Sequence, residues 1–447
     1  MRPWRRWCAV LALLCLLGCS LPLPGPAEPP SAQPVAPAAA PAHTATPACV
    51  PTALGLTTVP MHGLRSSPPA SASRTPTPFP TPRRAASPGP APKDLPAVLT
   101  AVPTILSEHG GDVAALVARL QAWGALEPAA NPWRQADLDG DGRAELLLLA
   151  GEPRSVDKAH WLTPGTRALL VLVGSGNVYA LGDSRPYKSA FRLDVPLVAD
   201  LNADARPEIV ATYQDCSANV CFLFVEVLVW EAGRLQSRLE RPLTMPFAAL
   251  EVEDRDCDGR FELSLRGGAY DTAGTGPIQP RREVYAWNGQ TYALAQTIFD
   301  PSPVRIHVFL DGDRALRRGD LKAALALYER VATDRALAET HRGKDVEERR
   351  TLEAFAYYRM LTVQAALGDR PAAARSLEAL RTRYGEHPCH PLAQAFWEAW
   401  QANGDLAAGC AAATAYATAH PEVLAAFGDY GQANPRLKVE DLCLLGR

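Results

Sequence analysis

The segments DLDGDGRAE at 137–145, DLNADARPE at 200–208 and DRDCDGRFE at 254–262 repeat one acidic pattern with the same internal spacing. Oxygen-bearing side chains stand at positions 1, 3, 5 and 9 of each segment, and the first and third segments carry glycine at position 6. Such spacing lets a tight loop wrap one hard cation, for which calcium is the leading inference. A strand-like apolar run follows each loop, so the sequence predicts repeated hairpins that are pinned by metal ions.

The side chains at these positions form three candidate ligand sets. They are Asp137, Asp139, Asp141 and Glu145; Asp200, Asn202, Asp204 and Glu208; and Asp254, Asp256, Asp258 and Glu262. Converging carboxylates repel one another unless a cation neutralises them. A single motif of this kind is also compatible with a solvated acidic turn, but three copies in register favour a metal. No catalytic base stands nearby, so we expect a structural metal.

The N-terminus indicates export. Three arginines, Arg2, Arg5 and Arg6, precede a short apolar stretch at 8–17, and LLGC follows at 16–19. This arrangement resembles a bacterial lipoprotein signal with its lipobox, which implies that residues 1–18 are a signal peptide and that Cys19 is acylated. The stretch is too short for an ordinary membrane-spanning helix, and the alternative is a secretory signal cut elsewhere. We expect an extracytoplasmic protein, anchored by lipid to a membrane of the bacterial cell envelope.

Residues 19–94 are dominated by Pro, Ala, Ser and Thr, and they contain few large apolar side chains. Such a segment buries too little surface to offset the entropy of ordering, so we expect a disordered tether. The whole chain has 45 Lys and Arg against 48 Asp and Glu, a net charge of -3, which does not favour nucleic-acid binding.

The remaining residues predict a multidomain β and α protein. Apolar residues at helical spacing predict a helical segment at 95–131, with helices over 95–106 and 112–126. Short apolar runs separated by Gly, Asn, Asp and Pro then predict a β-repeat domain at 132–302. Trp230 and Trp287 precede two similar turns and are expected at matching places in successive units.

The acidic loops and their strands resemble the FG-GAP or VCBS-type repeats of integrin-α-like β-propellers. The resemblance implies calcium held by the side chains at positions 1, 3, 5 and 9 and by a backbone carbonyl at position 7. The carbonyls would be those of Arg143, Arg206 and Arg260. Glutamate replaces the more usual aspartate at position 9, the Phe-Gly and Gly-Ala-Pro signatures are absent, and three units are fewer than a closed propeller needs. The expected fold is therefore a partial or diverged propeller.

The second loop departs furthest from the pattern. It has one carboxylate fewer than the others, and Ala205 stands where the turn glycine is expected. A left-handed alanine costs on the order of 1 kcal/mol. We expect this loop to be the weakest metal site.

The C-terminal part, 303–447, is rich in alanine at helical spacing and contains three Gly-Asp pairs, at 319–320, 368–369 and 404–405. Each pair is flanked by helical patterns. The segments resemble tetratricopeptide repeats, which implies stacked helix pairs with a concave face for a partner peptide or helix. The uneven spacing of the pairs leaves a generic helical bundle as the alternative.

An exported protein can oxidise its cysteines. Cys216 and Cys221 flank the expected tip of a hairpin, so we predict a disulfide between them. Two of Cys389, Cys410 and Cys443 are also expected to pair, but spacing does not say which. The HPCH motif at 387–390 lacks a fourth zinc ligand, and the Gly-Asp-Ser at 182–184 is expected to be a hairpin turn, since the rest of the related hydrolase motif is absent.

These observations favour a non-enzymatic, calcium-stabilised binding or scaffolding module whose partner is an unidentified envelope protein or peptide. Two alternatives stay open. An envelope hydrolase acting on glycan or peptide would need a free pair of carboxylates in a cleft, whereas a purely structural lipoprotein would need no partner.

Overall fold

The computed structural model describes residues 52–54, 90–127, 129, 131–153, 164–176, 178–217, 219–272, 274–340 and 345–445, with the backbone alone at 345 and 346. The expected signal peptide, Cys19, Cys49 and most of the expected tether lie outside the described residues. Within the described residues, no helix is long and apolar enough to cross a membrane. Antiparallel sheets and helices are both present, which confirms a mixed β and α protein.

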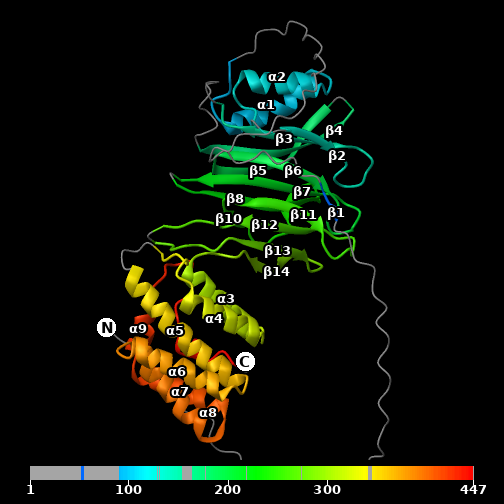
Figure 1. Ribbon diagram of the computed structural model, residues 1–447. Coiled ribbons are helices and arrows are strands. Elements are labelled where there is room, and N and C mark those ends of the chain that lie inside the picture. The colour runs from blue at the N-terminus through cyan, green and yellow to red at the C-terminus, as the bar shows by residue number, and fades with distance from the viewer. Residues whose placement is uncertain are drawn as a thin grey trace, which may run out of the picture. The chain divides into compact units, whose positions relative to one another are not determined.

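Three antiparallel sheets make up the β region (Figure 1). Sheet I has the order β2-β3-β4-β5, with strands Trp133–Ala136, Glu145–Gly151, Gly165–Ser175 and Val178–Ala190. Sheet II has the order β10-β8-β7-β6, with β9 also paired to β8; its strands are β6 Arg192–Ala199, β7 Glu208–Cys216, β8 Cys221–Glu231, β9 Arg234–Ser237 and β10 Leu243–Pro246. Sheet III has the order β1-β11-β12-β13-β14, with strands Thr52–Ala53, Ala249–Asp254, Glu262–Gly267, Arg281–Trp287 and Tyr292–Phe299. No closed barrel or propeller is seen in the described part of the chain.

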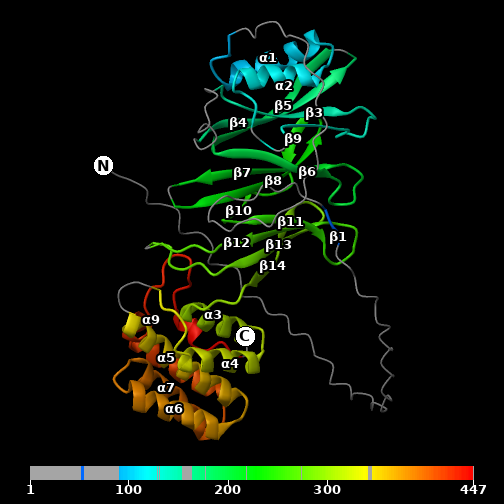
Figure 2. The same cartoon turned by 45° about the horizontal axis from the view of Figure 1, so that its top comes forward.

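The sheets are stacked in chain order, and helices cover the outer face of sheet I (Figure 2). The sequence of β3 is a continuous apolar run because all its residues are buried. Such runs are typical of strands that are covered on both faces. Leu146 and Leu148 pack on α1 (Leu95–Glu108) and α2 (Val113–Ala122), whereas Leu147 and Leu149 pack on sheet II. A second apolar layer joins sheet II to sheet III.

Two local expectations in this region are wrong. The second helix ends at Ala122 rather than at Leu126, which instead forms an isolated β-bridge with Ala150. Gly182 to Ser184 is not a hairpin turn but part of strand β5. There Asp183 accepts a hydrogen bond from the Leu235 N–H at 2.8 Å, so its polar side chain links sheet I to strand β9 of sheet II.

The C-terminal region is helical. Its helices are α3 Arg305–Arg317, α4 Leu321–Thr333, α5 Asp345–Ala366, α6 Arg370–Tyr384, α7 Cys389–Asn403, α8 Leu406–Ala419, α9 Glu422–Phe427 and the short 3-10 helix η2 Val439–Leu442. Each Gly-Asp pair turns one helix into the next. At the first turn Gly319 has φ +78° and the Asp320 carboxylate accepts from the Ala323 N–H at 3.0 Å, as a helix N-cap does.

The structure contains disulfides between Cys216 and Cys221 and between Cys410 and Cys443, whereas Cys389 is a free thiol buried in α7. Cys216 and Cys221 lie directly opposite each other where β7 turns into β8. Cys257, at position 4 of the third acidic loop, is also disulfide-bonded. No metal-binding group is found at His387 to His390 within the described residues.

Candidate metal-binding loops

The three acidic loops occupy the same place in the three sheets. Each loop joins two neighbouring antiparallel strands: β2 to β3, β6 to β7 and β11 to β12. The residue that pairs with the position-9 glutamate comes from the end of the preceding strand, as Ala136 does with Glu145 and Ala199 with Glu208. The loops are therefore structurally equivalent connections.

Their internal hydrogen bonds are equivalent as well. In each loop the position-1 aspartate accepts from the N–H of position 6, the position-5 aspartate accepts from the N–H of position 7, and the position-9 glutamate accepts from the N–H of position 2. For Glu145, Glu208 and Glu262 this last distance is 2.8 Å in every case. The backbone thus holds several carboxylates toward one small volume in each loop.

The first loop brings a metal-compatible group together. One carboxylate oxygen each from Asp137, Asp139 and Glu145 lies within 4.8 Å of the others, and Glu145 is the buried member. The Asp141 carboxylate lies outside this group and accepts from the Arg143 N–H at 2.8 Å. An oxygen-only donor set of this size fits a hard cation such as calcium.

The third loop gathers Asp254, Asp256 and Asp258 within the same 4.8 Å limit, and Glu262 lies outside that group. One oxygen of this loop, Asp254 Oδ1, is buried and has no hydrogen-bond partner among the described residues. A buried acceptor without a donor carries a large desolvation cost. A cation at this point would offset that cost, so the residues of the third loop fit a metal.

In the second loop, the amide side chain of Asn202 donates hydrogen bonds to two of the acidic side chains. The Asn202 Nδ2 donates to Glu208 Oε1 at 2.8 Å and to Asp204 Oδ2 at 3.2 Å. A positively polarised N–H therefore stands among these carboxylates. Within the described residues, this loop does not bring three carboxylates together as the other two loops do, and its rank as the weakest metal site stays a prediction.

The electrostatics of the loops favour either protonation of the position-9 glutamates or a bound cation that offsets their charge. Burial is the main cause that raises the pKa of Glu145, Glu208 and Glu262, and neighbouring aspartates raise it further. The effect is largest at Glu208, which is fully buried and whose pKa rises to about 7. A bound cation would favour the ionised carboxylates and lower these pKa values.

Metal-free protein is expected to lose stability as the pH rises from about 4.5 to about 7 because of Glu208. In that window the folded carboxyl, with a pKa near 7, keeps a proton that the unfolded carboxyl, with an ordinary pKa of 4.5, has released. The folded state binds more protons there, so its stability falls as the pH rises. Denaturant unfolding in chelator at several pH values should show this slope in the wild type and a shallower slope in Glu208→Gln, where only the raised pKa values of Glu145 and Glu262 still contribute in the same direction. An unchanged slope in that variant would contradict the assignment.

Backbone strain distinguishes the second loop. Ala205, at position 6, has φ +66°, where the equivalent residues are Gly142 and Gly259. Position 4 is left-handed in every loop, and the sequence pattern did not single it out: Gly140, Ala203 and Cys257 occupy it. These alanines hold a conformation that glycine adopts without a steric penalty.

Replacing Ala205 with glycine should stabilise metal-free protein by up to about 1 kcal/mol. Relief of the left-handed alanine is worth roughly 1–2 kcal/mol, and the greater freedom of glycine in the unfolded chain takes back about 0.4–1 kcal/mol. Chemical denaturation measures the difference. The matched control is Ala144→Gly, at an exposed loop position without positive φ, which should be neutral or destabilising. Equal destabilisation by both changes would contradict the strain argument.

Comparisons with family models, with curated proteins and with solved structures found no match for this chain. The loops therefore stand on their own geometry. The role of the Arg143, Arg206 and Arg260 carbonyl oxygens as ligands stays a prediction.

Proposed function

We propose that this chain is a lipid-anchored protein of the bacterial cell envelope, in which calcium rigidifies a diverged propeller-like β region and tetratricopeptide-like helices bind a protein partner. The observation that carries the calcium proposal is the recurrence of one hydrogen-bond network in three acidic loops. Chance acidic turns have no reason to share positions, partners and strand register.

The proposed role of calcium is structural. Each loop connects two hydrogen-bonded strands whose inner side chains form the layers between the sheets. A cation would hold the loop carboxylates together without electrostatic repulsion and would keep the paired strand ends in register. A rigid β region would then present the helical region at a defined place on its tether.

The helical region supports partner binding by its construction. Three helix pairs, α3/α4, α5/α6 and α7/α8, turn through the Gly-Asp pairs and share one core. Stacked helix pairs of this kind offer an extended face to peptides or helices. The lipid anchor at Cys19 follows from the signal-like N-terminus, which lies outside the described residues.

A hydrolase is less well supported. Ser302 Oγ lies 2.8 Å from His307 Nδ1, and His307 Nε2 lies 3.0 Å from the Pro277 carbonyl oxygen, as a nucleophile and base would. However, both side chains are more than nine-tenths buried, at 6% and 2% exposure, and Ser302 Oγ also accepts from the Val304 N–H. These groups are satisfied by one another at the start of α3, which is how a structural hydrogen-bond network is built.

Calcium titration by calorimetry tests the proposal. Metal-free full chain should bind two calcium ions with similar affinity, at the first and third loops, and a further ion more weakly at the second. Asp137→Asn should remove one of the tight sites and Asp256→Asn the other. Asp215→Asn, which changes an exposed carboxylate of β7 outside the loops, is the matched control. Absence of calcium binding at millimolar concentration would overturn the metal assignment.

The proposed binding of a protein partner is tested by cross-linking in intact envelope, with calcium and with chelator. Specific cross-links that depend on folded helices would support a binding module. Their absence in both conditions would favour the purely structural lipoprotein.

A further inference from the structure

The hydroxyl of Tyr292 is buried in the β region without a hydrogen-bond partner. This residue begins β14 and is 3% exposed, and no partner for its hydroxyl is found among the described residues. It packs in the apolar layer between sheets II and III, with its ring against Trp287. An unpaired buried hydroxyl costs free energy, and buried polar groups in native proteins nearly always have a partner. This hydroxyl therefore indicates a polar function inside an otherwise apolar layer.

The carboxylates of the second acidic loop act on this hydroxyl. Burial is the main cause that raises the pKa of Tyr292. Negative charges raise it further, and Glu208 and Asp200 of the second loop act more strongly than Glu262 of the third. Coulombic effects of this kind fall with distance, so the hydroxyl lies above all in the field of the second loop. A phenol hydroxyl donates hydrogen bonds to carboxylates, and those of the second loop are the acceptors that suit it.

A backbone hydrogen bond sets the second loop against sheet III. The N–H of Phe261, at position 8 of the third loop, donates to the carbonyl oxygen of Leu201, at position 2 of the second, at 2.8 Å. The first and second loops have no such connection available, because Pro207 stands at position 8 of the second loop and has no N–H. Leu201 packs in the same apolar layer as Tyr292. The second loop is therefore held next to the sheet from which Tyr292 comes.

Tyr292 has a counterpart one sheet earlier in the chain. Leu235 lies opposite Trp230 in β8 and β9, as Tyr292 lies opposite Trp287 in β13 and β14. Leu235 packs in the layer that contains Leu138 of the first loop. An apolar side chain thus shares a layer with the first loop, which has four acidic side chains, and a hydroxyl shares a layer with the second, which has three. The polar group stands where the loop has fewer charges of its own.

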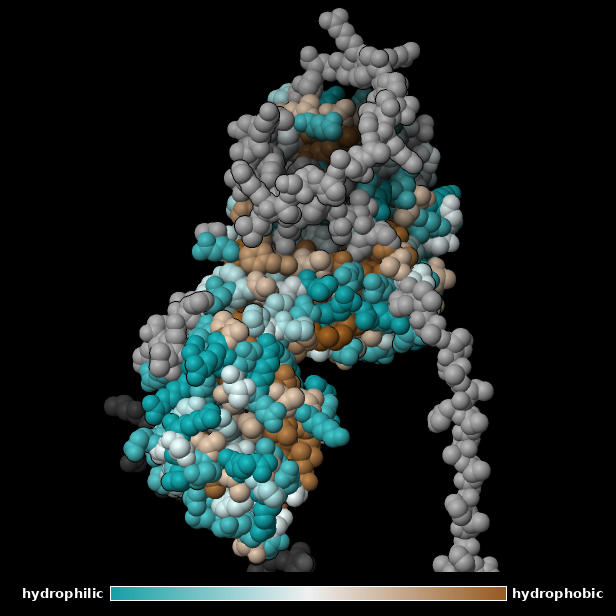
Figure 3. Space-filling view, viewed as in Figure 1, coloured by the Kyte–Doolittle hydropathy of each residue, from teal (hydrophilic) through white to brown (hydrophobic). Residues whose placement is uncertain are grey.

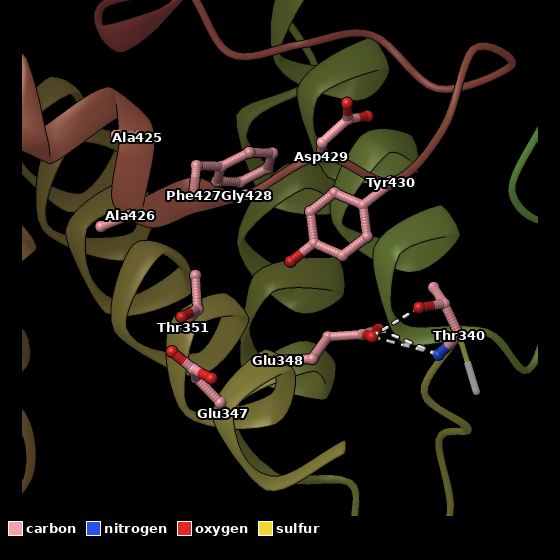
Figure 4. A pocket seen from close by; sticks show the side chains of 10 residues that line it. All are labelled: Thr340, Glu347, Glu348, Thr351, Ala425, Ala426, Phe427, Gly428, Asp429 and Tyr430. Carbon is pink, nitrogen blue, oxygen red and sulfur yellow. Dashed lines mark hydrogen bonds between the residues drawn. The ribbon is translucent and has the colours of Figure 1, made fainter. Parts of the chain in front are cut away.

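The cavity in the helical region differs from this place, because its acidic side chains are engaged within the chain. It lies between α5, α9 and the chain that follows α9 and has a volume of about 330 Å³ (Figure 4). There Glu348 accepts from the Thr340 hydroxyl at 2.6 Å, and Asp429 pairs with Arg436 at 2.8 Å. The face of the helical region visible in Figure 3 is mostly hydrophilic, with smaller apolar patches. Neither the cavity nor that face selects one ligand.

We propose that Tyr292 is a positioning residue for a cation in the second loop, with its hydroxyl donating to the carboxylates of that loop from the neighbouring sheet. Hydrogen bonds that orient ligating carboxylates are typically worth about 10–100-fold in metal affinity. Calcium in the second loop would then link sheet II to sheet III. The inference rests on the proposed calcium binding and adds to it a residue outside the acidic motif.

Calcium titration by calorimetry tests this role in the full chain carrying Asp137→Asn and Asp256→Asn, which isolates the second loop. In this background Tyr292→Phe should weaken calcium binding at least about tenfold. The unfolding midpoint of the metal-free protein should be unchanged or raised, since the change removes an unpaired buried hydroxyl. Tyr285→Phe is the matched control, because that hydroxyl, in β13 of the same sheet, donates to Glu283 at 2.7 Å. It should leave the calcium affinity unchanged.

Hydrogen exchange gives a second readout, which a merely structural tyrosine would not move. In the same background, calcium should slow exchange at 292–299, because the bound loop holds the hydroxyl at the start of β14. After Tyr292→Phe the exchange of this strand should no longer respond to calcium. If the two aspartate changes unfold the chain, the weakest binding step of the otherwise wild-type chain supplies the same comparison.

The outcomes separate this inference from the proposed function. Equal calcium affinity with tyrosine and with phenylalanine at position 292 would overturn the role of Tyr292 and leave calcium binding at the first and third loops intact. A second loop that binds no calcium, in a chain whose other loops bind it, would also overturn this inference alone. Absence of calcium binding in the wild type would overturn both.

Discussion

Chelation of calcium is expected to lower the unfolding midpoint of the full chain by on the order of 10 °C. A ligand at a thousandfold excess over its Kd stabilises the folded state by about 4 kcal/mol per site. For a domain of 150–250 residues, each kcal/mol shifts the midpoint by roughly 2–4 °C. The β region has this size, and each loop ties together two strands of one sheet. The measurement is thermal unfolding of metal-free protein against added calcium.

The controls identify the sites. Asp256→Asn should reduce the calcium response, because it removes one of the carboxylates grouped in the third loop, and Asp215→Asn should leave the response intact. Magnesium should stabilise less than calcium, because it requires near-ideal octahedral geometry and gives up water reluctantly. A midpoint that ignores calcium in protein shown to be metal-free at the start would remove the metal from the proposed function.

The second large effect is expected in the helical core, where Asp313→Ala should destabilise the protein by about 3–5 kcal/mol. Asp313 lies in α3 and is 3% exposed, and Arg359 lies in α5 and is 2% exposed. Arg359 Nη2 donates to Asp313 Oδ2 at 3.2 Å, and the Tyr328 hydroxyl donates to Asp313 Oδ1 at 2.6 Å. Removing one partner of a buried ion pair leaves an uncompensated charge, which is what makes the change costly.

This network also holds the C-terminal segment. Arg359 donates to the carbonyl oxygens of Asp441 and Leu442, at 2.7 and 2.9 Å. We therefore expect Asp313→Ala to disturb the segment around η2 as well as the helix pairs. Denaturant unfolding measures the loss, and hydrogen exchange at 439–445 reports the local effect.

Two further variants separate charge from packing. Tyr328→Phe removes one hydrogen bond and should cost about 0.5–1.5 kcal/mol. The double change Asp313→Leu with Arg359→Met removes both charges and should cost much less than Asp313→Ala, because apolar replacements of buried pairs are often neutral. A double variant as unstable as the single one would show that shape, not charge, governs this site.

Local sequence signals carried much of the secondary structure. The mixed β and α class followed from apolar runs of strand length at one end and helical spacing at the other, and it is confirmed. The Gly-Asp pairs indicated helix turns because glycine alone takes positive φ freely and aspartate caps the next helix. Similar reasoning failed at Gly182 to Ser184, where the antiparallel pairing of β5 with β4 overrode the turn-forming residues.

The sequence by itself determined that the acidic side chains at positions 1, 3, 5 and 9 of each loop converge, because a loop of nine residues has few ways to arrange them. It also placed Cys216 opposite Cys221 by hairpin register. Only the tertiary structure decided that Cys410 pairs with Cys443, that Asn202 points its amide into the second loop, and that Arg359 of α5 pairs with Asp313 of α3. These contacts join segments distant in the chain or depend on side-chain rotation, and both are set by packing among helices and sheets rather than by local spacing.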